Sequence, residues 1–292
     1  MTRIGIIGGS GLYGLDGLSD VRELNIETPF GPPSDSLTVG ELAGNQLVFL
    51  PRHGRGHVLA PNEVPYRANV FAMKSLGVEW LISISAVGSL AENLHPGAIS
   101  LPDQYIDRTT DRIPTFFGHG VVAHVSLADP NCAVLRQTIA KATASVGLKA
   151  KQGGTYVCIE GPAFSTRAES LLFRSWGAEV VGMTGMPEAR LAREAELHYA
   201  TLALVTDYDC WKTDEAAVSA DAVIATLQQN VANVRKILAA VIPMLGEVGA
   251  ANQHGCPCTT ALATAILTDR TRISDERREA LEPLLGKYFR GR

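Results

Sequence analysis

The sequence predicts an α/β fold with a mixed central β-sheet surrounded by helices. Three observations support this prediction. Short apolar runs rich in β-branched residues recur along the chain, amphipathic helical patterns lie between several of them, and the composition is 46% hydrophobic and 19% charged. A chain of 292 residues is also long enough to bury a sizeable core.

Six apolar runs are expected to form buried strands, because strands that are covered on both faces lose the alternation of polar and apolar residues. In chain order they are RIGIIG, NQLVFL, WLISISAVG, AISLPDQYI, EVVGM and YATLALVTD.

Five further segments carry the apolar spacing of amphipathic helices. Three of them stop at Gly77, Gly147 and Gly177, since glycine ends a helix at little steric cost. A fourth contains Pro187 and Glu188, which suit a helix N-terminus. The segments are residues 61–77, 130–147, 167–177, 186–197 and 219–245.

The chain is expected to form a catalytic domain over residues 1–245, with a C-terminal helical extension of the same domain over residues 246–292. Residues 246–255, GEVGAANQHG, are interpreted as a connector because glycine and polar residues interrupt the helical spacing.

Charge and apolar run length exclude several classes of partner. The formal net charge is −4 and no long block of lysine or arginine is present, so no nucleic acid is expected to bind. The apolar runs are too short to span a bilayer, and no leader peptide is evident at the start. The expected location is therefore the cytoplasm, without a membrane partner.

Five scattered cysteines are an odd number and do not form a disulfide framework, which also fits a reducing compartment. Cys256 and Cys258 are the only close pair. They are expected to be incidental thiols, because no second Cys/His pair completes a metal site nearby. No metal is therefore expected.

The loop GGSGLYG, residues 8–14, fits the G-x-G-x-x-G pattern of dinucleotide sites. Such a site needs a helix directly after the glycines, and Gly14 and Gly17 interrupt the segment that should form it, although Glu27 stands about where the acidic residue is required. A tight turn with free N–H groups and the Ser10 hydroxyl suits a small anion such as phosphate better. A Rossmann oxidoreductase remains an alternative.

Other polar side chains follow the predicted strands, where ligands gather in α/β sheets. Arg52 and His53 come after LVFL, Ser85 lies near the end of WLISISAVG, and Thr184 follows EVVGM. Each has an ordinary structural explanation: a surface arginine, a strand-end serine or a helix-capping threonine. Together they favour a phosphate site without a metal.

Eight motifs occur in order over nearly all of residues 3–245, and through them the chain resembles the trimeric class of purine nucleoside phosphorylases, in particular the 5′-methylthioadenosine phosphorylases. This resemblance implies that phosphate attacks the anomeric carbon, the base leaves and a pentose-1-phosphate forms. Phosphate is then a co-substrate and no cofactor is implied; the expected assembly is a homotrimer or a dimer of trimers. The motifs are IGIIGGSGL, TPFGPPSD, RHGRGH, ISAVGSL, IDRTT, IEGPAFSTRAE, GMTGMPE and TDYDCW.

The resemblance also implies roles for individual residues. Met183 is expected along the ribose, Phe164 near the ribose or base, and His124 near the 5′ group of a neighbouring subunit's site. An apolar surface for the methylthio group is expected from Val218, Ala220 and Val223. The phosphate-binding residues carried over by motif are Ser10, Arg52, His53, Ser85, Ala86 (through its N–H) and Thr184.

The residues at the base edge favour adenine. Ser165 suits N1 of adenine, and carboxylates suit its 6-amino group. Asp207 and Asp209 lie two apart and point to the same side if extended geometry persists. A protonated Asp207 then acts as general acid at N7, while Asp209 accepts from the amino group or supports Asp207. The alternative is a solvated acidic turn.

Departures from the family pattern keep other functions open. Gly182 stands where many adenine-type members have Asn, and Ala163 where an Arg is common; Ser10 and Ser85 replace threonines and keep the hydroxyl. The alternatives are a phosphorylase of methylthioinosine or other 6-oxopurine nucleosides and a non-catalytic purine-nucleoside binding protein.

Overall fold

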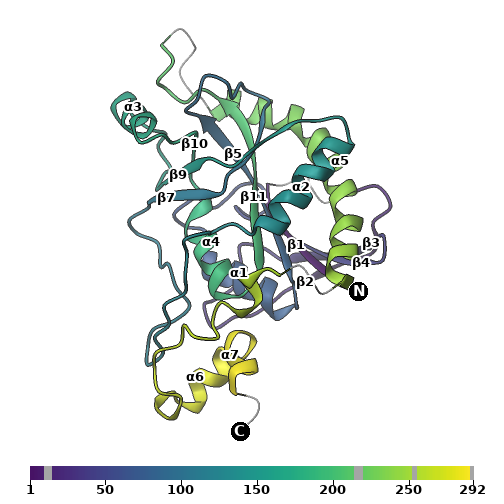
Figure 1. Cartoon of the computed structure of the whole chain (residues 1–292), viewed down its shortest axis with the longest axis vertical. Helices are drawn as coiled ribbons and strands as arrows, with labels where there is room; N and C mark the ends of the chain where they lie inside the picture. The colour runs from purple at the N-terminus through teal and green to yellow at the C-terminus, as the bar shows by residue number, and fades with distance from the viewer. Residues whose placement is uncertain (10–14, 214–219, 252–254, 290–292) are drawn as a thin grey trace.

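The computed structural model describes residues 1–9, 15–213, 220–251 and 255–289. A mixed sheet of eleven strands forms its centre, with helices α1 and α4 packed on one side and α2 and α5 on the other (Figure 1). The predicted fold class is therefore confirmed.

The strands run in the order β2-β3-β4-β1-β5-β10-β9-β7, and β11 pairs with β5 and with β6, which also pairs with β8. β1 is parallel to β4 and β5, whereas β10 is antiparallel to β5. The strands are β1 Arg3–Gly8, β2 Ser19–Leu24, β3 Leu37–Leu42, β4 Asn45–Pro51, β5 Trp80–Ser89, β6 Ile99–Leu101, β7 Gln104–Arg108, β8 Ala150–Gln152, β9 Thr155–Ile159, β10 Val180–Gly182 and β11 His198–Asp207.

The sheet splits along one edge of β5. β1 pairs with β5 as far as Ser83, and β10 pairs with it only at Gly88 and Ser89. Between these points, no described strand pairs with residues 84–87 on that edge, while β11 follows the other edge throughout. The split opens the sheet where ligands bind in α/β proteins, beside the carboxyl ends of strands.

The five predicted helices are present, and the C-terminal segment adds two more. Thr166 begins α3 with a capping box, in which its hydroxyl binds the Glu169 N–H and the Glu169 carboxylate binds the Thr166 N–H. The helices are α1 Tyr66–Ser75, α2 Ala133–Ser145, α3 Arg167–Ser175, α4 Gly185–Glu194, α5 Ala220–Ala251, α6 Asp275–Ala280 and α7 Glu282–Phe289, with 3₁₀ turns η1 Pro257–Thr260 and η2 Arg270–Arg272.

The predicted connector at residues 246–255 is wrong in its first half, because α5 continues to Ala251. A Cβ atom at Gly246 would lie 2.7 Å from Asn45 Oδ1, and one at Gly249 would lie 2.6 Å from Thr2 Oγ1. These glycines therefore allow the helix to approach the sheet closely, and their presence does not mark a loop.

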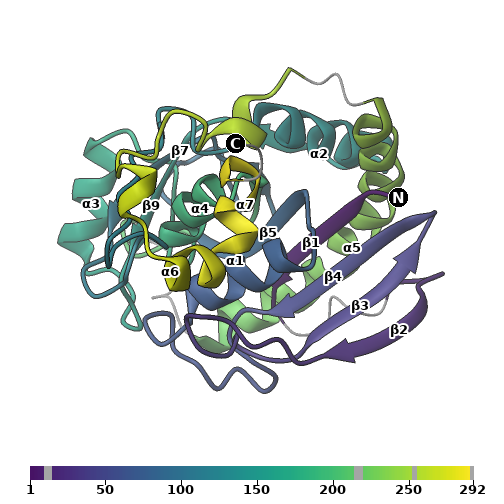
Figure 2. The same cartoon turned by 90° about the horizontal axis from the view of Figure 1, so that it is seen from below.

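The segment after α5 packs on the main core. Leu281, Leu284 and Leu285 belong to the same hydrophobic cluster as α1 and α4, and α7 lies beside α1 (Figure 2). The interpretation of residues 246–292 as an extension of the catalytic domain stays a prediction, with a boundary that must move past the end of α5.

The predicted strand at residues 98–106 is two strands, β6 and β7. Pro102 lies between them and lacks the N–H that a continuing ladder needs. Four strands, β2, β3, β8 and β9, were not among the predicted runs.

The topology excludes a Rossmann site at the N-terminal loop. β2 pairs antiparallel with β3, and the two parallel neighbours of β1 are β4 and β5, so β1 and β2 do not form a parallel crossover unit. Within the described ranges, no helix has the length and apolar character needed to cross a bilayer.

Candidate active site

The predicted phosphate residues that the structure describes gather at the split in the sheet. Arg52 and His53 follow β4, Ser85 and Ala86 lie in the unpaired stretch of β5, and Thr184 follows β10. Ser10 lies outside the described residues. The carboxyl ends of three strands therefore bring together residues that are far apart in the sequence.

Two hydroxyl groups form the centre of this cluster. Ser85 Oγ lies 2.9 Å from Thr184 Oγ1, and both residues are buried. The hydroxyl of Tyr156 lies 3.5 Å from Ser85 Oγ and accepts a hydrogen bond of 3.5 Å from the Thr184 N–H. Tyr156 was not predicted, because its sequence context, the apolar run TYVCI, only suggests core packing.

Tyr156 also explains the glycine at position 182. A Cβ atom at Gly182 would overlap the Tyr156 hydroxyl. The tyrosine thus occupies the space into which a side chain at 182 would project, and the departure of this chain from the family pattern is matched by a polar group from β9.

Arg52 is buried, with 2% of its surface exposed, so the alternative of a surface arginine is wrong. Its Nε and Nη2 atoms contact Glu188 at 2.9 and 3.2 Å, and Nη2 also donates to Ser83 Oγ at 2.7 Å. Nη1 donates to the carbonyl of Ile84 at 3.0 Å. One N–H of Nη1 has no partner among the described residues and is available to an anion.

Glu188 holds Arg52 in this position. It lies in the first turn of α4 and also accepts a hydrogen bond of 3.0 Å from the Tyr199 hydroxyl. In the sequence Glu188 predicts only a favourable charge at a helix N-terminus, and nothing nearby indicates a partner 136 residues away.

His53 is oriented so that its Nε2 can accept a hydrogen bond. Its Nδ1 lies 2.9 Å from the Leu59 carbonyl, which can only accept, so Nδ1 carries the proton and Nε2 has a lone pair. Burial and the neighbouring Arg52 charge lower the pKa of His53 to about 4. The imidazole is therefore neutral at neutral pH.

The acidic pair lies on the opposite edge of β5. Asp207 Oδ1 accepts the Asp209 N–H at 2.7 Å, and Oδ2 accepts the Thr206 hydroxyl at 2.7 Å. Asp209 has a φ of 52°, so extended geometry does not persist as the prediction required. Both acids instead pack on Gly88, where a Cβ atom would lie 2.9 Å from Asp207 Oδ1 and 3.3 Å from Asp209 Cβ.

The alternative of a solvated acidic turn is wrong, since Asp209 is 6% exposed. Burial raises the pKa of Asp207, although hydrogen bonds from Thr206 and Asp209 lower it. Burial also raises the pKa of Asp209, and the nearby Asp207 carboxylate adds to this effect. The two carboxyl groups are thus held in surroundings that favour a proton.

Three buried polar atoms beside the acids make no well-aligned hydrogen bond in the described part of the chain: Asp209 Oδ2, Ser165 Oγ and Ser170 Oγ. The two serine hydroxyls nevertheless lie close enough to Asp209 to lower its pKa, against the larger effect of burial. Leaving such groups unpaired costs about 1–3 kcal/mol each. A bound molecule that pairs with them recovers that cost, so these atoms mark a polar binding site. Ser170 was missed because its position in α3 suggests only a helix face.

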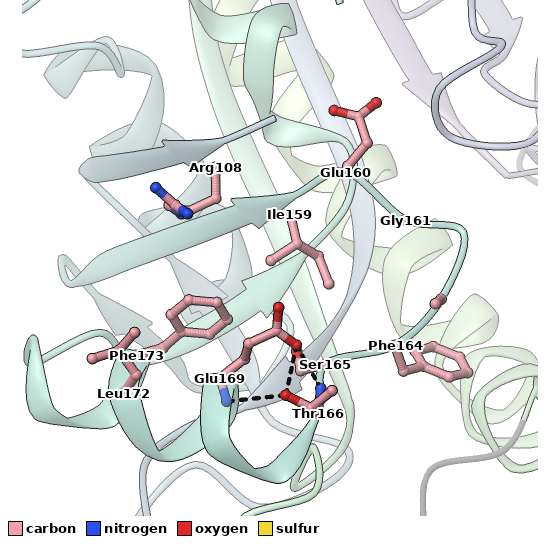
Figure 3. Close-up of a pocket in the computed structure, with 11 residues that line it drawn as sticks. Arg108, Ile159, Glu160, Gly161, Phe164, Ser165, Thr166, Glu169, Leu172 and Phe173 are labelled. Carbon is pink, nitrogen blue, oxygen red and sulfur yellow. Dashed lines mark hydrogen bonds between the residues drawn. The ribbon is translucent and has the colours of Figure 1, made fainter. Parts of the chain in front are cut away.

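The loop of residues 160–166 forms the outer wall of this region. Phe164 is 45% exposed, and Figure 3 shows it pointing away from Glu169 and Phe173 of α3. A pocket of about 310 Å³ lies between this loop and α3. It shares Phe164 and Ser165 with the predicted nucleoside residues and is lined by Arg108, Ile159, Glu160, Gly161, Ala163, Phe164, Ser165, Thr166, Glu169, Leu172 and Phe173.

Arg112 connects this loop to the turn that follows β10. It donates to the carbonyls of Met183 and Glu160, each at 2.6 Å, and to the Met186 carbonyl at 2.7 Å. Met183 is also held from the loop side, since a Cβ atom at Gly161 would lie 2.7 Å from its sulfur. Arg112 thus fixes the predicted ribose contact, Met183, relative to the loop. It lies just beyond the IDRTT motif and was not singled out.

The structure does not test the predicted roles of the remaining site residues, His124, Val218, Ala220 and Val223. His124 is exposed, and its N–H donates to the Ala265 carbonyl at 2.9 Å, in a segment that pairs with the C-terminal region. Val218 lies outside the described residues, and the side chains of Ala220 and Val223 are not described. Their predicted contacts with the 5′ group stay untested.

Comparisons with known proteins identify the family of this chain. The family model of the phosphorylase superfamily matches residues 3–243. The chain is 53% identical to the S-methyl-5′-thioadenosine phosphorylase of Geobacter sulfurreducens, with 98% of each chain covered, and 51% identical to that of Koribacter versatilis, with 99% and 97% covered.

Solved structures that are similar to this chain are also methylthioadenosine phosphorylases. A methylthioadenosine phosphorylase from an Antarctic soil metagenomic library has a TM-score of 0.91 at 48% identity, over 97% of this chain and 99% of that one. A methylthioadenosine phosphorylase from Schistosoma mansoni in complex with adenine has a TM-score of 0.83 at 35% identity, over 91% and 99%.

Proposed function

Since the chain belongs to the phosphorylase superfamily and, within it, to the S-methyl-5′-thioadenosine phosphorylases, we propose that it cleaves 5′-methylthioadenosine with inorganic phosphate. The products are adenine and 5-methylthioribose-1-phosphate. The observation that carries this proposal is the convergence of a paired hydroxyl cluster and two acids, Asp207 and the buried Asp209, on the two edges of β5. Such a reaction serves methionine salvage and the recycling of a polyamine by-product.

Phosphate occupies the split in the sheet. The hydroxyls of Ser85 and Thr184 and the unpaired N–H of Arg52 donate to its oxygens, together with the Ala86 N–H. His53 Nε2 accepts a hydrogen bond from the phosphate hydroxyl, because the ring is neutral and its Nδ1–H already donates to the Leu59 carbonyl. Ser10, which the family motif assigns to phosphate, is the remaining ligand of the proposed cage.

In the reaction, a phosphate oxygen forms a bond to the anomeric carbon while the bond from that carbon to N9 of adenine breaks. The electron pair of the broken bond passes into the purine. A protonated Asp207 then donates its proton to N7, which neutralises the developing charge. Burial favours this protonated state by raising the pKa of Asp207.

Adenine fits the unpaired atoms at the base edge. Asp209 Oδ2 accepts from the 6-amino group and the Ser165 hydroxyl donates to N1. Hypoxanthine carries a carbonyl oxygen where adenine has its 6-amino group, and an N1–H where adenine has a lone pair. The carbonyl oxygen and Asp209 Oδ2 are both hydrogen-bond acceptors, so they cannot pair with each other. Phe164 and Met183 cover the ribose and base.

The assembly follows the family as a homotrimer or a dimer of trimers. His124 is exposed on its own subunit and reaches the 5′ group of a neighbouring site only in such an assembly. Val218, Ala220 and Val223 provide the apolar surface for the methylthio group. The enzyme acts in the cytoplasm.

The proposal is tested by comparing kcat/KM for methylthioadenosine, methylthioinosine and inosine on one preparation. We expect the highest value for methylthioadenosine. A higher value for either oxopurine nucleoside would overturn the choice of base. Binding of methylthioadenosine without any release of adenine would indicate a non-catalytic binding protein.

A further inference from the structure

We propose that Cys132, His198, Cys256 and Cys258 form a structural zinc site that fastens the C-terminal segment to the amino end of β11. One sulfur from each cysteine and one nitrogen from the histidine all lie within 4.8 Å of one another. The sequence suggested two incidental thiols because Cys132 and His198 are remote from the Cys-Pro-Cys segment. Folding brings both of them to it.

The distances suit tetrahedral coordination. Cys132 Sγ lies 3.4 Å from His198 Nδ1 and 3.4 Å from Cys256 Sγ. Zinc bonds of about 2.3 Å to sulfur and about 2.0 Å to nitrogen place tetrahedral ligands roughly 3.5–3.8 Å apart. Cys256 Sγ and Cys258 Sγ, at 2.9 Å, need to separate by only about 1 Å.

Two of the four ligands are held by rigid elements. Cys132 is the N-cap of α2, and its sulfur accepts the Leu135 N–H at 3.5 Å. His198 is the first residue of β11, and its ring stacks on Trp80 with centroids 4.0 Å apart. Only the Cys-Pro-Cys segment comes from outside the sheet and its covering helices, directly before and within η1.

The surroundings also suit the charge of the site. Three thiolates and one zinc ion carry a net charge of −1, and Arg193 Nη1 lies 3.7 Å from Cys258 Sγ, where it offsets that charge. Cys132, His198 and Cys258 are buried, whereas Cys256 is partly exposed and gives the ion a route in. Four protein ligands leave no position for water or substrate, which is typical of structural zinc.

The site is remote from the proposed chemistry. His198 and Asp207 are the first and last residues of β11, a strand of ten residues. At about 3.3 Å per residue the two ends are roughly 30 Å apart. Zinc at the amino end is therefore expected to affect the stability of the fold and the attachment of residues 255–289, without changing the reaction.

A disulfide is the competing use of these thiols. It would join two of the three sulfurs and leave the third thiol and the imidazole without a role. Zinc uses all four groups, and three cysteines with one histidine in a tetrahedral arrangement are one of the usual ligand sets of structural zinc.

The test uses the full-length protein, reduced and reconstituted with zinc, then passed through a desalting column. We expect about one zinc per chain by elemental analysis and a large loss of bound zinc in Cys258→Ser. Cys210→Ser is the matched control, because this cysteine lies outside the cluster, and it should keep its zinc.

Cobalt provides an independent readout on the unmutated chain, so the result does not depend on whether a variant folds. Tetrahedral thiolate ligation should give intense ligand-field bands in the visible range and thiolate-to-cobalt charge transfer in the near ultraviolet. Removing zinc with a chelator should lower Tm and expose residues 255–289 to protease, while kcat for methylthioadenosine at low temperature stays within about twofold.

Three results would overturn the proposal. They are a zinc content near zero after reconstitution, an octahedral cobalt spectrum, or three free thiols among the five cysteines of the unreduced, denatured protein, which would show a disulfide. None of these results would contradict the proposed phosphorylase reaction, which is assayed separately.

Discussion

The two ends of β11 differ in how their buried polar groups are paired. At the carboxyl end, Asp209 Oδ2 and the hydroxyls of Ser165 and Ser170 are buried without a well-aligned hydrogen bond in the described chain. At the amino end, His198 faces three cysteine sulfurs at mutual distances that one ion can satisfy. The unpaired atoms at the carboxyl end suit a substrate that binds and is released in each turnover. The four-ligand set at the amino end suits a permanently bound ion.

The comparison also shows how the carboxyl end of β11, with its unpaired polar atoms, is supported. Unpaired buried groups cost about 1–3 kcal/mol each, so the reaction end is held by contacts that do not take part in chemistry. Glu188, which positions the phosphate donor Arg52, and Arg112, which pairs with Glu160, provide such contacts. Substitutions at the two ends should therefore separate activity from stability.

The largest expected effect is on catalysis at the carboxyl end. Asp207→Ala should lower kcat for methylthioadenosine by roughly 100- to 10,000-fold, because the leaving adenine loses its proton donor. Ser165→Ala removes one neutral hydrogen bond and should cost about tenfold or less. Steady-state kinetics on both variants checks this, and equal, small losses would contradict the role of Asp207 as general acid.

Thr184→Val should raise the KM for phosphate by roughly 10- to 100-fold, since a hydrogen bond to a charged group is worth about 1.5–3 kcal/mol. The KM for the nucleoside should change much less. Thr138→Val is the matched control, because Thr138 donates to the Val134 carbonyl within α2, on the other side of the sheet. An unchanged phosphate KM in Thr184→Val would remove this hydroxyl from the cage.

The pH dependence should report the proton on Asp207. Burial raises its pKa, and the protonated form is the active one, so kcat/KM should fall as pH rises through that raised value. Asp207→Asn carries an amide that donates at every pH, so its kcat/KM should not show this fall as the pH rises. The ionisation of phosphate affects both proteins equally, so the ratio of their profiles isolates Asp207. A ratio independent of pH would argue against the assignment.

The smallest effect is expected away from both ligands. Gly246→Ala inserts a methyl group against Asn45 and should destabilise the fold by about 1–2 kcal/mol, once the gain in helix propensity is subtracted. Thermal unfolding measures this, and kcat should not change. Glu247→Ala, at the next and exposed position of α5, is the control and should shift stability by less than about 0.5 kcal/mol.

Local patterns were enough to predict most of the fold. The runs that became β1, β4, β5 and β11 are long and apolar, and the glycine stops after α1, α2 and α3 lie where the helices end. The errors arose where a residue type has two physical uses. Gly246 and Gly249 resemble loop residues in sequence, yet in the structure they allow close packing within a helix.

The site was predictable in its composition but not in its pairing. Ser85 and Thr184 come together as strand ends suggested. No local signal connects Arg52 to Glu188, Tyr156 to Thr184, or Cys132 to Cys256, because these contacts depend on strand order and on how the C-terminal segment returns to the sheet. The left-handed backbone at Asp209 likewise depends on the tight packing of both acids against Gly88.

The most direct test of the account is the dependence of methylthioadenosine cleavage on phosphate. Purified protein, freed of phosphate, is incubated with methylthioadenosine with and without added phosphate, and adenine and the sugar product are quantified. We predict that adenine forms only with phosphate, together with an equal amount of 5-methylthioribose-1-phosphate. Adenine released at the same rate without phosphate, with free methylthioribose as the other product, would contradict it.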